Sequence, residues 1–367
     1  MGDNKIKILE VVTVPTEKSG IPNVAFNIMG ALPREDVELG YVAINDPSEF
    51  FKDKLADLGA RLFVIPRKLT SPWNYVVRLA KVAKGYDVMH VHGNSATMVL
   101  EMIAARIAGV KIRAAHSHST SCSMKSIDRL ARPLFHSLCN CRLACGQDAG
   151  TWLFGERHFE VIRNGIDTSE FRFDESRRKD IRSQLGLADE YLIGNIANFL
   201  EVKNHRFLIE IMRALNDRRR DIKLLLLGDG ELAEQIKADV RSKGLEDVVF
   251  FAGSVSNPAD YMSAMDFIIM PSIHEGLPLT LIEEQANGLS AMVSDAITKE
   301  ADLTGNLTYM SLGDSADKWT DKLELLIEKA PRNSSVSEKS IEKIIKQGYD
   351  ISSSANSLIE LFRSYPG

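Results

Sequence analysis

The sequence predicts an α/β protein made of two Rossmann-like domains that face each other. Short apolar runs rich in β-branched residues alternate with amphipathic stretches along the whole chain, which is typical of parallel sheets covered by helices on both faces. The alternation also begins a second time near the middle of the 367 residues, and a chain of this length suits two domains.

In the first half, strands are expected where apolar, β-branched runs are bounded by turn residues. These runs are Lys5–Val14, Val37–Asn45, Arg61–Pro66, Asp87–His92, Lys111–His118, Arg142–Gly146 and Glu160–Arg163. Apolar residues at helical spacing between them, as in Asn23–Leu32, Trp73–Ala83 and Ala96–Ile107, predict the covering helices.

A stretch without periodicity, Gly165–Ser176, is expected as an interdomain linker between domains 1–167 and 168–349. Ligands are expected in the cleft between the two sheets, beyond the carboxyl ends of the strands. The polar segment Ser335–Phe362 is expected to be helical. The expected strands of the second half are Tyr191–Asn198, Ile222–Gly228, Val248–Gly253, Asp266–Pro271 and Leu289–Asp295.

Composition indicates a cytoplasmic globular protein, with 44% hydrophobic and 26% charged residues and four cysteines. The sequence shows no apolar run of membrane-spanning length and no signal-peptide pattern at its start. Residues 1–165 contain 21 Lys and Arg against 16 Asp and Glu, so the remainder contains 24 against 34. The basic first half either meets an anionic partner such as a membrane or reflects chance scatter of surface charge.

The strongest local signal is the segment His274–Glu284, which directly follows an expected strand. Gly276 permits close approach of the backbone, and Pro278 suits the first turn of a helix. The free N–H groups at a helix start form an anion site suited to a diphosphate. Glu275 and Glu283 can each accept hydrogen bonds from hydroxyls, one set on a sugar and one on a ribose.

This segment resembles the signature of glycosyltransferase family 4, whose members have the GT-B fold and carry two glutamates separated by seven residues in E-G-L-P-L-x-L-I-E-A-x-A-x-G. Here Gln285, Ala286 and Gly288 complete the phrase. Further matches follow the family's order: Ser19-Gly20-Ile21 for its glycine loop, Arg163-Asn164-Gly165-Ile166-Asp167 for N-G-I-D, Lys203-Asn204-His205 for K-N-H and Leu226-Leu227-Gly228-Asp229-Gly230 for L-x-G-D-G.

The resemblance implies that the second domain binds a nucleotide-diphosphate sugar and the first binds the acceptor. Glu275 would hold the hexose hydroxyls, Glu283 the ribose, and Lys203 the diphosphate leaving group. The other implied donor-binding positions are Gly20, Gly276, Leu277, Pro278, Leu279 and Thr280. In the family, the C-terminal segment, here residues 350–367, crosses back to the first domain.

One position departs from the family pattern, which commonly has a diphosphate-binding arginine shortly before the lysine. Asn198 stands at that position and carries no charge. Either Arg163 or another cation compensates, or donor binding is weaker.

Histidines at expected strand ends of the first domain can act on a hydroxyl or contact the donor sugar. The resemblance places a functional histidine after the strand that begins at Lys111, and His118 is preferred for it over His116. For His90 the expected role is packing in the core. The phrase His116-Ser117-His118-Ser119 resembles the H-S-H-N of enzymes that build capsular and exopolysaccharide units on lipid carriers.

Two other patterns suggest different chemistry. Cys139, Cys141 and Cys145 lack a matching fourth zinc ligand nearby, so buried free thiols and no metal site are expected. The segment Gly228–Ala233 fits a loose dinucleotide-binding pattern, with Asp247 as the acidic partner, but it follows a second rather than a first strand of its domain. A dehydrogenase is therefore an alternative, as is a sugar-nucleotide epimerase or hydrolase on the same fold.

The expected activity is thus retaining transfer of a hexose, from a UDP-sugar by family frequency, to a glycan or lipid-linked acceptor. The sequence contains no Asp-x-Asp, so neither a metal nor another cofactor is expected, and no nucleic acid. A basic amphipathic stretch with Lys125, Arg129 and Arg132 is either an ordinary domain helix or a contact with the inner face of the membrane.

Overall fold

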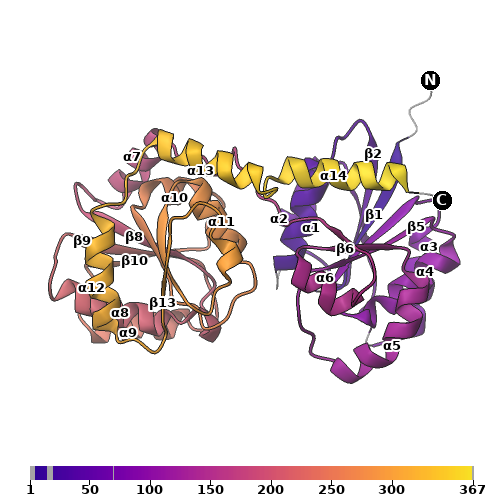
Figure 1. Ribbon diagram of the computed structural model, residues 1–367, viewed down its shortest axis with the longest axis horizontal. Coiled ribbons are helices and arrows are strands. Elements are labelled where there is room, and N and C mark those ends of the chain that lie inside the picture. Colours follow the sequence, from indigo (N-terminus) through magenta and orange to yellow (C-terminus); the bar gives the residue numbers. More distant parts are fainter. Residues whose placement is uncertain (1–4, 15–19, 69, 366–367) are drawn as a thin grey trace. The chain divides into compact units, whose positions relative to one another are not determined.

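The computed structural model describes residues 5–14, 20–68 and 70–365. The chain divides into two compact units, residues 1–165 with 348–367 (unit 1) and residues 166–347 (unit 2). Each unit is a parallel sheet flanked by helices (Figure 1). The expected α/β class with two Rossmann-like domains is confirmed.

In the described part of unit 1 the sheet has seven strands in the order β3-β2-β1-β4-β5-β6-β7. The order reverses direction at β1, as in other doubly wound sheets. The strands are β1 (Ile6–Val12), β2 (Val37–Ala43), β3 (Arg61–Val64), β4 (Val88–Gly93), β5 (Ile112–Ser117), β6 (Cys141–Ala144) and β7 (Glu160–Val161).

One apolar core of unit 1 lies between the sheet and helices α3 to α6, and it includes Leu9, Val91, Tyr75 and Phe154. Helix α14, although last in the chain, packs against α1 (Figure 1). The helices of this unit are α1 (Gly20–Ala31), α2 (Glu49–Asp57), α3 (Pro72–Ala83), η1 (Ala96–Met98), α4 (Val99–Ala108), α5 (Lys125–Leu138), α6 (Gln147–Phe154) and α14 (Ile351–Ser364).

The sheet of unit 2 has, among the described residues, six strands in the order β10-β9-β8-β11-β12-β13. They are β8 (Tyr191–Ile196), β9 (Ile222–Leu227), β10 (Val249–Gly253), β11 (Phe267–Met270), β12 (Ser290–Ser294) and β13 (Leu307–Met310). Its helices are α7 (Glu175–Gln184), η2 (Glu201–Lys203), α8 (His205–Asn216), α9 (Ala233–Ser242), α10 (Pro258–Ala264), α11 (Leu279–Ala286), η3 (Lys299–Ala301), α12 (Ala316–Ile327) and α13 (Ser334–Lys346).

The expected linker Gly165–Ser176 is not a free connection. Phe171 and Phe173 are buried in unit 2, and the Arg332 guanidinium lies 4.8 Å from the centre of the Phe173 ring. The Phe173 amide also donates to Ser337 Oγ at 3.0 Å. The segment therefore belongs to the core of unit 2, because its two aromatic side chains bury apolar surface there.

The expected polar helix Ser335–Phe362 is two helices, α13 and α14, in different units. Gly348 separates them with a φ of +78°, a left-handed conformation that glycine adopts without a Cβ clash. Both helices have a buried face, which includes Ile341 and Ile344 in α13 and Leu358 and Phe362 in α14. Strand β13 was not expected, because its short run Leu307–Met310 is only partly apolar.

Candidate active site

The candidate site of unit 2 lies at the carboxyl ends of β8 and β11. These two strands are neighbours in the sheet, and the chain leaves them toward opposite sides, since β9 lies beyond β8 and β12 lies beyond β11. Loops that follow such neighbouring strands diverge and leave room for a ligand between them. The loop after β8 contains Asn198 and Lys203, and the loop after β11 contains Glu275.

Lys203 and Glu275 form a partly buried ion pair, with 2.5 Å between Nζ and Oε1. Two hydrogen bonds tie their loops together: the Ile273 amide donates to the Val202 carbonyl at 2.8 Å, and Asn204 Nδ2 donates to the Pro271 carbonyl at 3.1 Å. These bonds fix the backbone on both sides of the pair. An ammonium has three N–H donors, so Lys203 can bind a phosphate oxygen while it keeps Glu275.

Helix α11 begins directly beside this pair. Pro278 has extended backbone angles and immediately precedes the first helical residue, Leu279. The first amide groups of a helix have no partner inside the helix, and their dipoles favour an anion. A Cβ added at Gly276 would meet no atom within 4 Å, so the backbone there is open to a ligand. Leu277 and Thr280 are half-buried at the same end of the helix.

The later part of the family phrase holds α11 in place. Gln285 donates to the Leu281 and Ala301 carbonyls and accepts from Leu303, Thr304 and the Thr304 hydroxyl. A Cβ at Gly288 would lie 2.9 Å from the Ser337 amide nitrogen, so only glycine allows α13 to pack there. These residues orient the helix rather than offer groups to a ligand.

Two consecutive carboxyl groups of α11 have raised pKa values. Burial, and then the charge of Glu170, raise the pKa of Glu283 to about 7. Burial and Glu283 hold the pKa of Glu284 well above its usual range, although Lys203 lowers it. Glu284 is fully buried, and neither of its carboxyl oxygens has a partner in the described part of the chain. Sequence reasoning missed Glu284; the signal was a second glutamate in the apolar phrase Leu281-Ile282-Glu283-Glu284.

Arg163 is not among the residues that the structure brings together in unit 2. Its guanidinium lies 5.1 Å from the centre of the Tyr349 ring, and both residues belong to unit 1. Asn198 is exposed after β8, and its carbonyl accepts from the Leu200 amide at 2.8 Å. That Arg163 replaces the family's diphosphate-binding arginine therefore stays a prediction, because its side chain is not part of unit 2.

Gly228 and Gly230 of the dinucleotide-like pattern allow the loop after β9 to pack closely against the loop after β8. A Cβ at Gly228 would clash with the Ala197 carbonyl, and one at Gly230 would lie 2.7 Å from the Phe199 carbonyl oxygen. The Asp229 carboxylate accepts from the Gly230 amide at 2.7 Å. The loop follows β9, the second strand of its unit, so its glycines have a structural reason that needs no dinucleotide.

In unit 1 the predicted residues His116 and His118 belong to a row of buried polar side chains. Glu10 on β1 pairs in register with His90 on β4, and His92 pairs with His116 on β5. Residues two apart on a strand share a face, so these side chains lie on the same side of the sheet. Glu10, His90, His92 and His116 are fully buried, and His118 is half-buried at the end of β5.

These five side chains contact one another in a line. Glu10 Oε2 lies 2.7 Å from His92 Nε2, and His92 Nδ1 lies 2.9 Å from His118 Nε2. On the other side, Glu10 Oε1 lies 3.1 Å from His90 Nδ1, and His90 Nε2 lies 3.1 Å from His116 Nδ1. His90 is in the core, as expected, but it is part of a polar network rather than an isolated core residue.

Other predicted residues of unit 1 lie elsewhere. Gly20 is exposed as the first residue of α1, and Ser19 of the same motif is outside the described residues. Cys139 and Cys141 are buried free thiols, and burial raises their pKa values to about 11 and about 12. Cys145 is also a thiol but is only half-buried, so the expected burial was wrong for this residue, which directly follows the end of β6.

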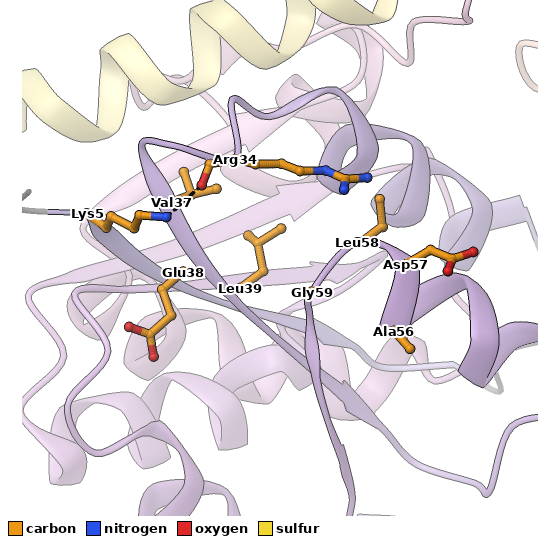
Figure 2. Close-up of a pocket in the computed structure, with 9 residues that line it drawn as sticks. All are labelled: Lys5, Arg34, Val37, Glu38, Leu39, Ala56, Asp57, Leu58 and Gly59. Carbon is orange, nitrogen blue, oxygen red and sulfur yellow. Dashed lines mark hydrogen bonds between the residues drawn. The ribbon is translucent and has the colours of Figure 1, made fainter.

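A surface pocket of 470 Å³ in unit 1 does not coincide with any of these residues. It lies where β1 and β2 begin, beside the end of α2, and includes Lys5, Glu38 and Asp57 (Figure 2). Lys5 Nζ donates to the Arg34 carbonyl at 2.9 Å there. This is the amino end of the strands, opposite to the end that carries the histidines.

The fold and the similarity to known proteins together define a class of enzyme, the GT-B glycosyltransferases. Residues 18–170 match the family model described as Glycosyltransferase Family 4, and residues 177–343 match the model described as Glycosyl transferases group 1. A proposed glycosyltransferase of Bacillus subtilis (strain 168), EpsF, is 31% identical over 99% of this chain and 97% of its own length. The chain therefore belongs to the family 4 glycosyltransferases with the GT-B fold.

Two further relatives are informative. The UDP-Gal:alpha-D-GlcNAc-diphosphoundecaprenol alpha-1,3-galactosyltransferase of Escherichia coli is 26% identical over 80% of this chain and 80% of its own. The crystal structure of HepE from Anabaena in complex with UDP superposes with a TM-score of 0.79 at 20% identity, covering 98% of this chain and 100% of HepE. HepE has also been solved with UDP-glucose.

Among the described residues, no helix has the length and apolar character needed to cross a membrane.

Proposed function

We propose that this glycosyltransferase moves a hexose from a UDP-sugar to a hydroxyl of a lipid-linked glycan in surface polysaccharide synthesis, with retention of configuration and without a bound metal. The Escherichia coli relative carries UDP-Gal and a diphosphoundecaprenol acceptor in its name, and HepE binds UDP and UDP-glucose. Both support a uridine nucleotide as donor, and the first supports a lipid-linked acceptor.

The observation that carries the proposal is the Lys203–Glu275 pair at the carboxyl ends of β8 and β11, beside the start of α11. One cation and the helix amides suit a diphosphate, and the carboxylate suits sugar hydroxyls. Glu283, the fifth residue of α11, would accept hydrogen bonds from the ribose hydroxyls. Glu275, Gly276, Leu277, Pro278, Leu279 and Thr280 would form the wall along the donor.

In the proposed reaction the bond between the anomeric carbon and the diphosphate oxygen breaks, and the electron pair leaves with the diphosphate. The acceptor oxygen attacks the same face, and its proton passes to a phosphate oxygen of the leaving group. Lys203 and the amides of α11 stabilise the charge that grows on the diphosphate. His118, assigned to the donor sugar by the resemblance, would contact the hexose.

The test compares Glu275→Gln and Lys203→Ala with Glu234→Gln and Lys237→Ala, which alter an exposed lysine–glutamate pair on α9 of the same unit. Glu275→Gln is expected to lower transfer roughly a hundredfold, because a neutral amide weakens hydrogen bonds to the sugar. Lys203→Ala is expected to weaken UDP binding in calorimetry. Unchanged transfer and unchanged UDP affinity in both site variants would contradict the proposal.

The donor and the metal are tested separately. Thermal-shift measurements with UDP-, GDP-, ADP- and CMP-sugars should show the largest stabilisation for a UDP-sugar, since a ligand stabilises in proportion to its affinity. Transfer should persist in EDTA. Turnover of a UDP-sugar without acceptor would favour the epimerase or hydrolase alternative instead.

A peripheral membrane contact through α5 is part of the proposal. Ile127, Leu130 and Leu134 are exposed by 55%, 85% and 51%, and their spacing places them on one face of the helix. Lys125 and Arg129 are exposed nearby. An exposed apolar face flanked by cations suits the surface of an anionic bilayer, where a lipid-linked acceptor would reside.

A further inference from the structure

The row of Glu10 and four histidines in unit 1 has hydrogen-bond spacing throughout. Its four links measure between 2.7 and 3.1 Å, and each histidine that lies between two partners uses one ring nitrogen for each. His90, His92 and His116 also lie close enough to hold a metal ion. In this structure both ring nitrogens of His90 and of His92 lie within hydrogen-bond distance of Glu10 or of another histidine.

The charge of Glu10 decides which way the hydrogen bonds run. Burial alone would raise its pKa, but His90 and His92 lower the pKa of this carboxyl to about 2, so it is ionised. An ionised carboxylate has no proton to donate. His92 must therefore donate from Nε2, and His90 from Nδ1.

The direction of the hydrogen bonds at His92 determines the tautomer of His118. Burial, with the charge of His90, lowers the pKa of His92 to about 4, so its ring is neutral and carries one proton, on Nε2. Its Nδ1 is then an acceptor, and His118 must donate to it from Nε2. Burial also holds the pKa of His118 well below its usual range, so the Nδ1 of His118 keeps a lone pair.

That Nδ1 has no hydrogen-bond partner among the residues described. The Asn164 side chain lies near enough to this ring to raise its pKa somewhat, but its carboxamide oxygen also lacks a partner with hydrogen-bond geometry among the residues described. A lone pair on Nδ1 accepts from a hydroxyl and repels a phosphate or carboxylate oxygen. A sugar hydroxyl that displaces the Asn164 side chain could donate to it.

We propose that Glu10 is a positioning residue that acts through His92 to hold the proton of the His118 ring on Nε2, which leaves an acceptor at Nδ1 for a sugar hydroxyl. The inference rests on the proposed function, which assigns His118 to the sugar. A neutral ring suits that place, because the reacting sugar carries developing positive charge and an imidazolium beside it would raise the barrier.

The most direct test is nitrogen NMR of the protein labelled with 15N-histidine, whose eight histidines are assigned by single substitutions. At neutral pH, His118 should show protonated Nε2 and unprotonated Nδ1. The opposite tautomer, or an imidazolium, in the wild-type protein would overturn the proposal. The variants serve only for assignment, and the result is read from the wild-type protein without an activity measurement.

Glu10→Gln tests the role of the charge. The amide has the same shape but offers one acceptor and one donor, so it can no longer accept from both histidines. We expect the tautomers of His92 and His118 to reverse, or His118 to exchange between its two tautomers. We also expect kcat for transfer to fall about tenfold, the value of one hydrogen bond, with a smaller change in KM for the UDP-sugar.

A His92→Gln variant interrupts the same arm, and the double variant should lose little more than either single one, because both act through one path. Glu38→Gln is the matched control, since Glu38 is on the same sheet but forms an exposed ion pair with Lys7. Additive losses, or Glu10→Gln spectra with an unchanged His118, would show a merely structural role.

Three outcomes distinguish this inference from a metal site and from a failure of the proposed function. Zn²⁺ titrated alone into the wild-type protein should leave the resonances of His90, His92 and His116 unchanged; tight binding there would replace the hydrogen-bonded chain with a metal site. Absence of any UDP-sugar binding would defeat the proposed function. Normal binding and transfer with a freely exchanging His118 tautomer would defeat only the role of Glu10.

Discussion

In the proposed donor site, burial affects the protonation of two neighbouring glutamates differently. Glu283 and Glu284 are adjacent in α11, yet Glu284 is fully buried whereas Glu283 is half-buried and faces the charge of Glu170. The pKa of Glu284 is far above its usual range, so it stays neutral, while the pKa of Glu283 is about 7. Only Glu283 therefore changes charge near neutral pH.

We predict that UDP-glucose binds more tightly as pH rises from 6 to 8. In the proposed complex an ionised Glu283 accepts from the ribose hydroxyls, and a pKa of about 7 makes the ionised fraction rise roughly tenfold over this range. Calorimetry at several pH values checks it, with UDP-glucose preferred to UDP because its diphosphate does not titrate near neutrality.

Two variants control this experiment. Glu283→Gln should bind more weakly and with no dependence on pH. Glu170→Gln removes the charge that helps to raise the pKa of Glu283, so it should move the transition to lower pH. Affinity of the wild-type enzyme that is constant between pH 6 and 8 would exclude Glu283 as the titrating ribose contact.

At the scale of one element, the three basic residues of helix α5 differ in their surroundings. Arg132 was grouped with Lys125 and Arg129, but the structure turns it inward: its Nε donates to Asp128 at 2.8 Å and its Nη1 to the Trp152 carbonyl at 3.0 Å. Asp128 in turn accepts from the Ala96 amide at 2.7 Å. Arg132 therefore joins α5 to the rest of unit 1, and only two of the three cations are left for a membrane.

Leu130→Ser is expected to weaken binding to vesicles of phosphatidylcholine mixed with phosphatidylglycerol roughly thirtyfold. Leu130 is 85% exposed, so the fold loses little, whereas insertion of a leucine into a bilayer contributes about 2 kcal/mol. Cosedimentation measures the effect. Leu325→Ser, which changes a leucine of unit 2 that is 61% exposed, is the control. Equal binding of both variants would remove α5 from the contact, and vesicles without the anionic lipid should bind less in every case.

At the scale of the whole molecule, buried histidines with lowered pKa values and buried glutamates with raised pKa values are divided unevenly between the two units. In unit 1, burial lowers the pKa of His92 and His136 to about 4 and those of His116 and His118 well below their usual range. In unit 2, His205 is lowered to about 4, but Glu283 and Glu284 are raised.

We predict that unit 1 loses stability before unit 2 when the pH falls from 6.5 to 4. In that window the unfolded chain binds protons at histidines that the folded unit keeps neutral, so each such group lowers the free energy of unfolding by up to about 1.4 kcal/mol per pH unit. Glu283 has the opposite effect: its raised pKa contributes stability below pH 4.5 that is lost as pH rises to 7.

Calorimetry across this range should show one transition that moves down on acidification more than the other. Trp319 is buried in unit 2, so fluorescence of a variant with Trp73→Phe and Trp152→Phe identifies the transition of that unit. Transitions that shift together, or a transition of unit 2 that moves first, would contradict the prediction.

Local pattern was enough for the alternation of strands and helices and for the placement of Glu275 in a loop and Glu283 in a helix. Glu275 and Glu283 keep their family spacing because a loop and a helix that follow one strand are local structures, and β8 and β11 match their apolar runs closely. The buried free thiols Cys139 and Cys141 were equally predictable, since they lie in an apolar environment at the end of α5 and in β6.

Long-range packing decided the rest. Only the register of β1, β4 and β5 brings Glu10 to four histidines that are at least 80 residues away, and only the packing in unit 2 makes Phe171 and Phe173 core residues. The inward turn of Arg132, the place of Arg163 beside Tyr349 and the burial of Glu284 have the same origin. A sequence determines which side chains share the face of one element, whereas their partners and pKa values depend on elements that arrive from distant parts of the chain.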